Sequence, residues 1–578
     1  MLFIELAKSM EQLEKTRSRL EMTQIISELF KKTSSKEIDK VIYLLQGKIA
    51  PEHKGIKLGL GERYVELALA KSMGYDLVTV QKMFSQKGDL GDVAEELSEK
   101  KKQMALFSEE LTVEKVYLNF YKLAEKSGHG SQEVKINILS EMLNNAKPVE
   151  AKYISRFPIG SLRLGVGDPT ILDALSNMKK GDKSDREMLE KAYNVSSDLG
   201  ELARKYMETK KEKFEVEMKL FTPLRPALAE RLSSGEDILT KINECIVEAK
   251  YDGFRLQCHK KGNEVEIFSR NLERMTEMLP DVVESIRKEI KVDEIIFEGE
   301  AIGYNEEEKK FYSFQQTMQR KRKYDIDKKS EEIPLKLFVF DVMFYKGKNV
   351  TSLPLKERKN ILKEVIKNNK TIEVSEGYHV KTAEEIESYF NDFLNRGLEG
   401  LMAKDLNAPY VAGARKFSWI KLKKSYKTEL SDTIDITVIG YYSGKGSRTK
   451  FNFGGILGGV YDSNTDMFYS IAKVGSGFTE EQMKEFGEKL EKIKMKNKHS
   501  RIDSEISPDF WVEPKYVITV TADEISKSPT HTCGKFDGEK GYALRFPRII
   551  GGIRKDKNPE DSTSVDEIIK MYKLQKNN

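Results

Sequence analysis

The sequence contains few cysteines and no long apolar segment. Cys245, Cys258 and Cys533 are the three cysteines in 578 residues, and no two of them form a C-x-x-C pair. This spacing argues against a disulfide framework and against a zinc knuckle. Because no apolar run is long enough to cross a bilayer, we expect no membrane span. Glu5 interrupts the apolar start of the chain, so we expect no signal peptide and a cytoplasmic protein.

A strong net charge is also absent. The 98 Lys and Arg residues nearly balance the 93 Asp and Glu residues, which leaves a net charge of +5. This value is compatible with binding to nucleic acid but does not require it, because affinity for phosphates depends on local basic surfaces. A chain of 578 residues exceeds the usual size of one hydrophobic core, so we expect several domains.

Residues 1–215 are predicted to form an all-α domain. The apolar residues between Val134 and Leu143 recur with the period of a helix, and residues 170–178 show a second helical pattern after a Gly-Asp-Pro turn. The charged segment 207–220 then leads into the proline-marked sequence FTPLRPALAERL. We place a domain boundary there.

Beyond this boundary the sequence pattern changes from helices to strands. In residues 216–427, the strand-like segments VEIFSR, EIIFEGEAIGY, LKLFVFDVMFY and EGLMAK alternate with helical stretches such as 382–395. This predicts an α+β domain with antiparallel sheets. In residues 428–578, short strands such as ITVIGYYSG are separated by Gly and Asn turns, with one helix expected at 479–494. A small β-barrel is the natural expectation for this part.

The most informative motif is KYDGFR, which begins at Lys250. A lysine becomes a nucleophile when its ammonium loses a proton, and desolvation or a nearby cation favours this by lowering its pKa. The apolar residues before Lys250 predict a strand that carries it into a partly dry site. Asp252 and Gly253 would turn the chain, and Arg255 could then reach a ribose or a phosphate. Taken alone, the motif also fits an ordinary hairpin with exposed charges.

Further motifs follow in a fixed order. They are SRN at 269–271, FEGE at 297–300, FVFDVMFYKG at 338–347, EGLMAK at 399–404, GARKFSWIKLKKSY at 413–426 and ALRFPRIIGGIRKDKNPED at 543–561. Together with KYDGFR, they resemble the ATP-dependent DNA ligase family of the archaeal and eukaryotic replicative type. The resemblance implies a helical DNA-binding domain at 1–215, an adenylation (nucleotidyltransferase) domain at 216–427 and an OB-fold domain at 428–578.

The resemblance also implies roles for individual residues. Lys250 would attack the α-phosphate of ATP and carry AMP. Glu248 and Phe340 would contact adenine, and Arg270 would lie near ribose and phosphate. The other nucleotide contacts would come from Arg255, Glu300, Arg415, Lys421 and Lys423. The last motif would contribute Arg548, Arg554, Asp556 and Lys557.

The chemistry of ATP explains why these residue types would be needed. Attack on the α-phosphate moves negative charge toward pyrophosphate, so cations must neutralise it. Lys421 and Lys423 alternate along a predicted strand, so both can face the nucleotide if Leu422 faces the core. Glu300 and Glu399 would hold Mg²⁺ through carboxylate oxygens, and Mn²⁺ would suit the same ligands.

The N-terminal region carries a resemblance of its own. KGDLGDVAEEL at 87–97 and RFPIGSLRLGVGDPTIL at 156–172 are similar to the DNA-binding domain of this ligase class. Glycines allow close approach to phosphates, and Arg156 and Arg163 would contact nicked double-stranded DNA. Such contacts read the DNA backbone rather than the base sequence, which suits an enzyme that acts at any nick.

The segment from Gln103 to Phe107 resembles, by its position, a loop that docks archaeal ligases onto a sliding clamp. A second aromatic residue, which is often found in that loop, is replaced here by Met-Ala-Leu. A surface loop tethered by Phe107 therefore remains an equal alternative. The resemblance further implies a monomer that acts on the nucleoid of an archaeal-type cell.

The expected activity is the sealing of DNA nicks in replication, repair and recombination. AMP would pass from the lysine to the 5′-phosphate, and the 3′-hydroxyl would then displace it. An RNA ligase or an mRNA capping enzyme would share the lysine and the barrel without needing the helical region, and a non-catalytic DNA-binding scaffold would not need the nucleotide residues. ADP or GTP in place of ATP stays open. NAD is disfavoured, because the zinc-finger cysteines of NAD-type ligases are missing.

Overall fold

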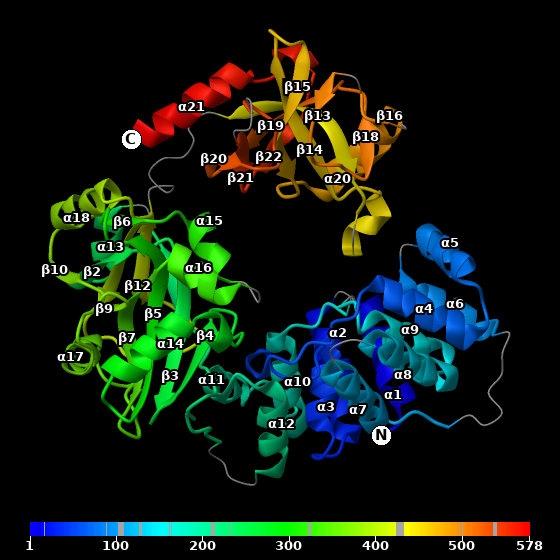
Figure 1. The fold of residues 1–578 in the computed structure, drawn as a ribbon. Coiled ribbons are helices and arrows are strands. Elements are labelled where there is room, and N and C mark those ends of the chain that lie inside the picture. The colour runs from blue at the N-terminus through cyan, green and yellow to red at the C-terminus, as the bar shows by residue number, and fades with distance from the viewer. Residues whose placement is uncertain are drawn as a thin grey trace. The chain divides into compact units, whose positions relative to one another are not determined.

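The chain divides into two compact units, Met1–Leu422 and Lys423–Asn578. The computed structural model describes all residues except 17, 88, 102–108, 127–129, 161, 163, 210–213, 233, 322–324, 424–432, 445, 496, 500, 536–539, 556 and 578. Within the first unit, a helical core covers the residues up to Phe214, and separate sheet cores begin at Leu224 (Figure 1).

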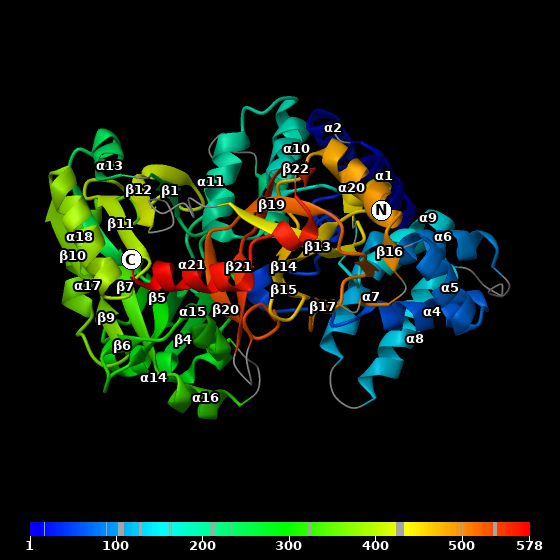
Figure 2. The same ribbon diagram turned by 90° about the horizontal axis from the view of Figure 1, so that it is seen from above.

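The N-terminal part of the first unit is helical, as the sequence predicts. Its helices bury one face each in a common core, and α2 and α10 lie side by side (Figure 2). α10 begins at the predicted turn with a proline in its first turn, a position where no backbone N–H donor is lost. The helices are α1 (Phe3–Lys15), α2 (Arg19–Lys32), α3 (Ile38–Leu45), α4 (Glu62–Met73), α5 (Leu77–Lys87), α6 (Leu90–Glu99), α7 (Val113–Glu125), α8 (Ser131–Asn145), α9 (Pro148–Arg156), α10 (Asp168–Lys180), α11 (Arg186–Ser196) and α12 (Leu199–Glu208).

Arg156 does not lie where a DNA contact would place it. Its side chain is 1% exposed and forms ion pairs with Glu14 at 2.8 Å, Asp89 at 3.0 Å and Asp92 at 3.0 Å. It packs so closely on α6 that a Cβ added at Gly91 would come within 2.5 Å of its Nε. The expectation that Arg156 contacts DNA was therefore wrong, because its charge is neutralised inside the helical core. Arg163 and the segment 103–107 lie outside the described residues.

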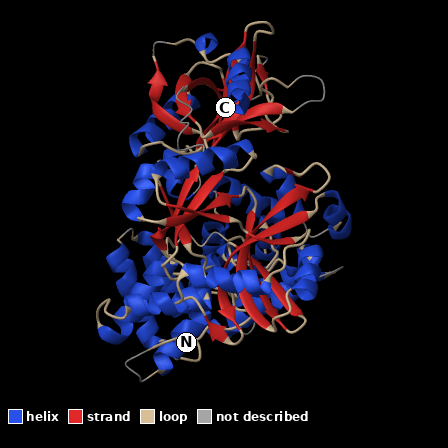
Figure 3. Cartoon of the chain, turned by 90° about the vertical axis from the view of Figure 1, so that its left-hand side faces the viewer, coloured by secondary structure: helices blue, strands red, loops and turns tan. Residues whose placement is uncertain are grey.

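Strands, drawn red, and helices, drawn blue, alternate in the sheet-containing part of the chain (Figure 3). One sheet of the first unit has the strand order β1-β12-β11-β2-β10. The helix predicted at 382–395 is confirmed as α18 (Ala383–Asn395), which packs on this sheet through Ile386, Phe390 and Phe393. Its strands are β1 (Leu228–Arg231), β12 (Arg415–Lys423), β11 (Gly400–Asp405), β2 (Cys245–Lys250) and β10 (Gly377–Val380).

The other sheet has the order β4-β3-β5-β7-β8, with β6 paired to β5 and β9 paired to β7. α14 (Pro280–Glu289) and α17 (Leu355–Val365) cover it with apolar residues such as Ile286 and Leu362. The strands are β4 (Glu264–Ser269), β3 (Phe254–Lys261), β5 (Glu294–Asn305), β7 (Leu335–Tyr345), β8 (Lys348–Asn349), β6 (Lys310–Phe311) and β9 (Ile372–Val374).

The prediction of antiparallel sheets needs correction at two strand pairs. β1 runs parallel to β12, and β9 runs parallel to β7. Parallel neighbours require a crossover connection, and α17 supplies one between β7 and β9. The remaining pairs that contact β2, β3 and β5 are antiparallel, as expected.

The second unit is built around β13, which pairs with β14, β18 and β19. β14 continues to β15, and β19 continues to β22, while β20 and β21 form a separate ribbon. The helix expected at 479–494 is confirmed as α20 (Glu480–Glu491), with Thr479 as its N-cap. The strands and the last helix are β13 (Ile434–Tyr442), β14 (Gly455–Asp462), β15 (Met467–Val474), β16 (Lys494–Met495), β17 (Ile502–Asp503), β18 (Phe510–Val512), β19 (Val517–Thr521), β20 (Glu524–Ser528), β21 (Gly541–Arg545), β22 (Arg548–Arg554) and α21 (Val565–Asn577).

The cysteines and the lengths of the helices bear on two expectations, that the chain has no disulfide framework and no membrane span. Cys245, Cys258 and Cys533 are all buried and free of disulfide bonds. Among the residues that the structure describes, no helix combines the length and the apolar character that a bilayer span requires.

The buried Arg156 cluster provides a test of the helical core. Arg156→Met should lower the free energy of unfolding by about 3–5 kcal/mol, because it removes three ion pairs from one buried site. Chemical denaturation followed by circular dichroism would measure the change. The matched control is Lys191→Met, which breaks the exposed pair with Glu187 and should leave the unfolding midpoint nearly unchanged. Equal midpoints for the two variants would contradict a structural role of Arg156.

Candidate active site

Lys250 lies where the chain passes from one sheet to the other. It is the last residue of β2, and Phe254 begins β3 in the second sheet. The hairpin alternative is therefore excluded. The turn between the strands lies against β5, so that a Cβ added at Gly253 would come within 2.2 Å of the Ala301 carbonyl oxygen. Glycine is required at this position because of that close approach.

The ammonium of Lys250 forms an ion pair with the carboxylate of Glu399, and the two side chains are 21% and 23% exposed. The backbone reinforces this contact. The amide of Glu399 donates a hydrogen bond to the Lys250 carbonyl at 3.0 Å, and Gly400 is the partner of Lys250 in the β2–β11 ladder. Lys250 is thus held at its backbone and at its side-chain end by the same neighbouring segment.

The charges around Lys250 change the expected direction of its pKa. Burial by itself would lower this pKa, but Glu399, Glu300 and Asp252 outweigh burial and raise it. The expectation of a lowered Lys250 pKa is therefore wrong, as far as the groups of the protein itself determine that pKa. Burial also raises the pKa of Glu300 to about 7, although Lys250 and Arg255 oppose this. Carboxylates grouped at one place can also serve as oxygen ligands for a further cation.

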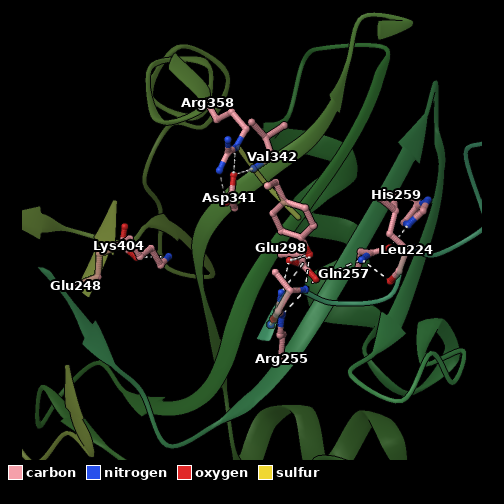
Figure 4. Close-up of polar contacts among 12 residues, drawn as sticks. Leu224, Glu248, Arg255, Gln257, His259, Glu298, Asp341, Val342, Arg358 and Lys404 are labelled. Carbon is pink, nitrogen blue, oxygen red and sulfur yellow. Dashed lines mark hydrogen bonds and ion pairs between the residues drawn. The ribbon is translucent and has the colours of Figure 1, made fainter. Parts of the chain in front are cut away.

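Arg255 is fixed by a buried acceptor, Glu298, whose side chain is 1% exposed (Figure 4). The guanidinium donates to the Glu298 carboxylate at 3.2 Å and 2.5 Å, and to the Ala227 carbonyl at 2.7 Å. The Tyr410 hydroxyl donates to the same carboxylate at 2.8 Å. The Arg255 guanidinium also lies 5.3 Å from the centre of the Phe340 ring. The Glu298 carboxylate, which Tyr410 supports, and the Ala227 carbonyl thus set its position next to an aromatic face.

Phe340 belongs to an aromatic pair next to a buried charge cluster. Its ring meets Trp419 edge to face, with 5.8 Å between the ring centres. The Lys404 ammonium lies 4.6 Å from the Phe340 ring and 4.4 Å from the Trp419 ring. Lys404 donates to Glu248 at 2.7 Å (Figure 4). Lys359 forms a second ion pair with Glu248, which is 2% exposed. An aromatic pair with cations beside it can stack against a purine.

Other predicted site residues lie elsewhere or are not described. Arg270 is exposed next to the end of β4 and lines a cavity of about 630 Å³ together with Asp168 and Arg225. Lys421 lies on β12 beside the fully buried Leu422, which matches the predicted alternation. Outside the described side chains or residues lie Arg415, Lys423 and Asp556.

Four residues of this arrangement were not anticipated from the sequence. Glu298 could have been, because it lies two residues before Glu300 and therefore on the same face of β5. Trp419 had a weaker signal, as one of two tryptophans in the chain and part of a basic strand. Lys404 and Tyr410 carried no local signal, since their contacts come from strands and loops that are distant in sequence.

Comparison with known proteins gives matches along the chain. A family model described as "ATP dependent DNA ligase domain" matches residues 226–423. The model "DNA ligase N terminus" matches residues 2–176, and the model "ATP dependent DNA ligase C terminal region" matches residues 449–557.

Similar proteins extend over nearly the full length. A "Probable DNA ligase" of Dictyoglomus turgidum is 45% identical over 577 residues, covering 100% of this chain and 98% of the relative. A "DNA ligase" of Nitrosopumilus maritimus is 40% identical, covering 99% and 98%. The solved structure "Pmar-Lig_PreS3" has a TM-score of 0.55 at 18% identity, covering 94% of this chain and 98% of that one, which shows a shared fold.

The chain belongs to the ATP-dependent DNA ligase family. It has an N-terminal helical domain, an adenylation domain and a C-terminal β domain. It is accordingly an ATP-dependent DNA ligase, which seals nicks through the covalent mechanism that the sequence led us to expect. The family resemblance is confirmed, and the alternatives of a capping enzyme and a non-catalytic scaffold are not supported.

The charge balance around Lys250 predicts a change in its titration. Glu399→Gln should lower the Lys250 pKa, because burial then acts against fewer carboxylates. The amine would consequently form at lower pH, and modification of Lys250 by an amine-specific reagent should become faster at pH values where the wild type is still protonated. Peptide mass spectrometry over a pH series would measure this. An unchanged or higher apparent pKa in the variant would contradict the assignment of Glu399 as a dominant partner.

Proposed function

We propose that Lys250 is the residue that carries AMP. Three features support this proposal: the turn at Gly253 fixes Lys250 between two sheets, Glu399 and Glu300 surround its ammonium with carboxylates, and the Phe340–Trp419 pair offers an aromatic surface near the same strands. The observation that best supports it is the ion pair of Lys250 with Glu399, because it identifies a partly buried lysine whose protonation depends on a neighbouring carboxylate.

Lys250 acts in the first of three steps. Its Nζ, once deprotonated, attacks the α-phosphorus of ATP, so that an N–P bond forms while the bond to the pyrophosphate oxygen breaks. The 5′-phosphate at the nick then attacks the same phosphorus and displaces the lysine. Finally the 3′-hydroxyl attacks the activated 5′-phosphorus, loses its proton, and releases AMP as the phosphodiester bond forms. Each step is an in-line displacement that needs fixed geometry and neutralised charge.

Glu300 and Glu399 are the proposed ligands for Mg²⁺, or for Mn²⁺. No group of three or more potential ligands gathers among the described residues, but Mg²⁺ commonly takes one or two carboxylates together with substrate phosphates. Both carboxylates act on the Lys250 ammonium, and their oxygens are ligands that suit a divalent cation. Such an ion would offset phosphate charge and favour the neutral amine of Lys250 by repulsion.

The remaining nucleotide contacts are proposals of the same kind. Phe340 stacks on adenine and Glu248 contacts its edge, with Lys404 and Lys359 holding that carboxylate in place. Arg255 contacts the ribose or a phosphate from the position that Glu298 gives it. The proposed ribose and phosphate contacts further include Arg270, Arg415, Lys421 and Lys423, and, for pyrophosphate, Arg554 and Lys557 of the second unit.

The domain borders and the DNA-binding regions extend the proposal. We infer a DNA-binding domain at 1–215, an adenylation domain at 216–427 and an OB-fold domain at 428–578; the separate helical and sheet cores and the pairing of β13 with β14, β18 and β19 support this division. Nicked duplex DNA is the substrate, and the enzyme acts as a monomer on the nucleoid. Docking of the segment from Gln103 to Phe107 on a sliding clamp belongs to the same proposal.

Replacing the nucleophile tests the central assignment. Lys250→Ala should abolish the acid-labile AMP adduct that forms with α-labelled ATP, because no other group is proposed to attack the α-phosphate. Binding of nicked duplex DNA should change by no more than about twofold, since DNA affinity comes mainly from contacts to the backbone. Gel analysis of the labelled protein and a mobility-shift titration measure the two quantities. Survival of the adduct in this variant would place the nucleophile elsewhere.

Metal dependence tests the two carboxylates. Chelation of divalent cations should stop adduct formation, and Mg²⁺ or Mn²⁺ should restore it. In Glu300→Gln, half-maximal adduct formation should require at least about tenfold more Mg²⁺, since even loss of a residue outside the metal's own ligands typically costs about 10–100-fold in affinity. Glu289→Gln, on the surface of α14, is the control and should follow the wild type. Identical Mg²⁺ curves for Glu300→Gln and the wild type would remove Glu300 from the metal site.

A further inference from the structure

Asp435 of the second unit holds two cations that come from one motif. Its carboxylate lies 2.6 Å from the Lys557 ammonium and 3.4 Å from the Arg554 guanidinium. The Thr519 hydroxyl donates to it at 2.6 Å. Its backbone is fixed as well, since its amide donates to the Thr563 hydroxyl at 3.0 Å and its carbonyl accepts from the Thr563 amide at 2.9 Å.

The strands explain how these groups meet. Asp435 is the second residue of β13, between the buried Ile434 and Ile436, so its side chain lies on the opposite face from theirs. It pairs with Thr519 of β19, and β19 pairs in turn with β22. The β19–β22 register shifts where Gly551, with φ at +68°, and Gly552 interrupt β22. This irregularity brings the end of β22, with Arg554, back toward β13.

The acceptor Asp435 is less exposed to solvent than its two donors, Arg554 and Lys557. The Asp435 side chain is 11% exposed, whereas those of Arg554 and Lys557 are 34% and 31% exposed. The carboxylate therefore lies behind the two cations, which face solvent. Asp435 accepts one of the three N–H bonds that a lysine ammonium can donate.

Asp435 remains ionised in this environment. Burial raises the pKa of its carboxyl, but the hydrogen bonds from Lys557 and Thr519 and the charges of Lys557 and Arg554 outweigh burial and lower it. A charged, backbone-anchored acceptor that lies behind two cations can orient them without competing strongly with an anion that approaches them from the solvent side. As a contributor to stability, such a pair is weak, because desolvation offsets much of the attraction.

We propose that Asp435 is a positioning residue for the adenylylation step: it holds the Lys557 ammonium and the Arg554 guanidinium in one place, ready to bind the pyrophosphate part of ATP. This inference rests on the proposed function of Arg554 and Lys557 as pyrophosphate contacts. It concerns only the step in which ATP reacts. Once AMP is on the 5′-phosphate of the nick, pyrophosphate has already left, and Asp435 has no part in forming the phosphodiester bond.

The test separates these two steps in the full-length enzyme. Asp435→Asn keeps the size of the side chain and removes its charge. Formation of the lysine adduct is followed in a single turnover. The ATP concentration that gives half the maximal rate should rise about tenfold, as expected for the loss of one charge-assisted orienting contact. The rate of sealing a nick that already carries a 5′-adenylate should stay within about twofold of the wild type. That second rate also shows that the variant is folded. Asp466→Asn, which alters the exposed pair with Arg501, is the matched control and should change neither quantity.

Distinct outcomes identify which idea fails. The positioning role is overturned if Asp435→Asn leaves the ATP concentration for half-maximal rate unchanged or lowers it. A lower value would mean that Asp435 competes with phosphate for the two cations. Equal losses in adduct formation and in sealing of the adenylated nick would also overturn it, as a general structural effect. Lys557→Ala and Arg554→Ala test the underlying function. If neither impairs adduct formation, the pyrophosphate contact itself is wrong, whatever Asp435→Asn shows.

Discussion

The lack of space at Gly253 is the constraint on which the arrangement around Lys250 depends. The turn touches the carbonyl of Ala301 on β5, so the chain can leave one sheet and enter the next within a few residues. Lys250 ends the first sheet there, and Arg255 and Glu300 face each other as register partners in the second. Groups from β2, β3 and β5 thereby meet around Lys250, and no long side chain has to bridge the gap between these strands. A side chain at position 253 would push β5 away and separate the lysine from Glu300.

Buried charges around this point are balanced in small local sets. Arg255 is matched by Glu298 and Arg358 by Asp341 (Figure 4). Glu248 forms ion pairs with two lysines. Such sets add little to stability when compared with apolar packing of the same volume, because each charge loses its hydration. Their effect is geometric: each partner has one favourable position, so the aromatic pair and the cations beside it keep their mutual orientation. The fold thus uses charge to position groups and uses its apolar cores to remain folded.

Much of the fold was readable from the sequence, because periodicity is a local property. LKLFVFDVMFY was predicted as a strand and is β7 (Leu335–Tyr345), and the helix expected at 382–395 is α18 (Ala383–Asn395). The family followed from the order of the motifs. Long-range partners were not readable: Arg156 looked like a DNA contact because no local pattern reveals the three carboxylates that bury its charge. The pKa of Lys250 was misjudged for the same reason, since Glu399 is 149 residues away in the chain.

The buried cysteines have a practical consequence for watching this enzyme work. Burial raises the pKa of Cys245 to about 12 and raises those of Cys258 and Cys533 as well, so the native thiols stay protonated and enclosed. Thiol reagents react with the exposed thiolate, and these three offer none at neutral pH. A cysteine introduced on the surface of each unit would therefore take up a dye without prior removal of native residues. Paired dyes could then report, in single molecules, whether the distance between the two units changes while a nick is being sealed.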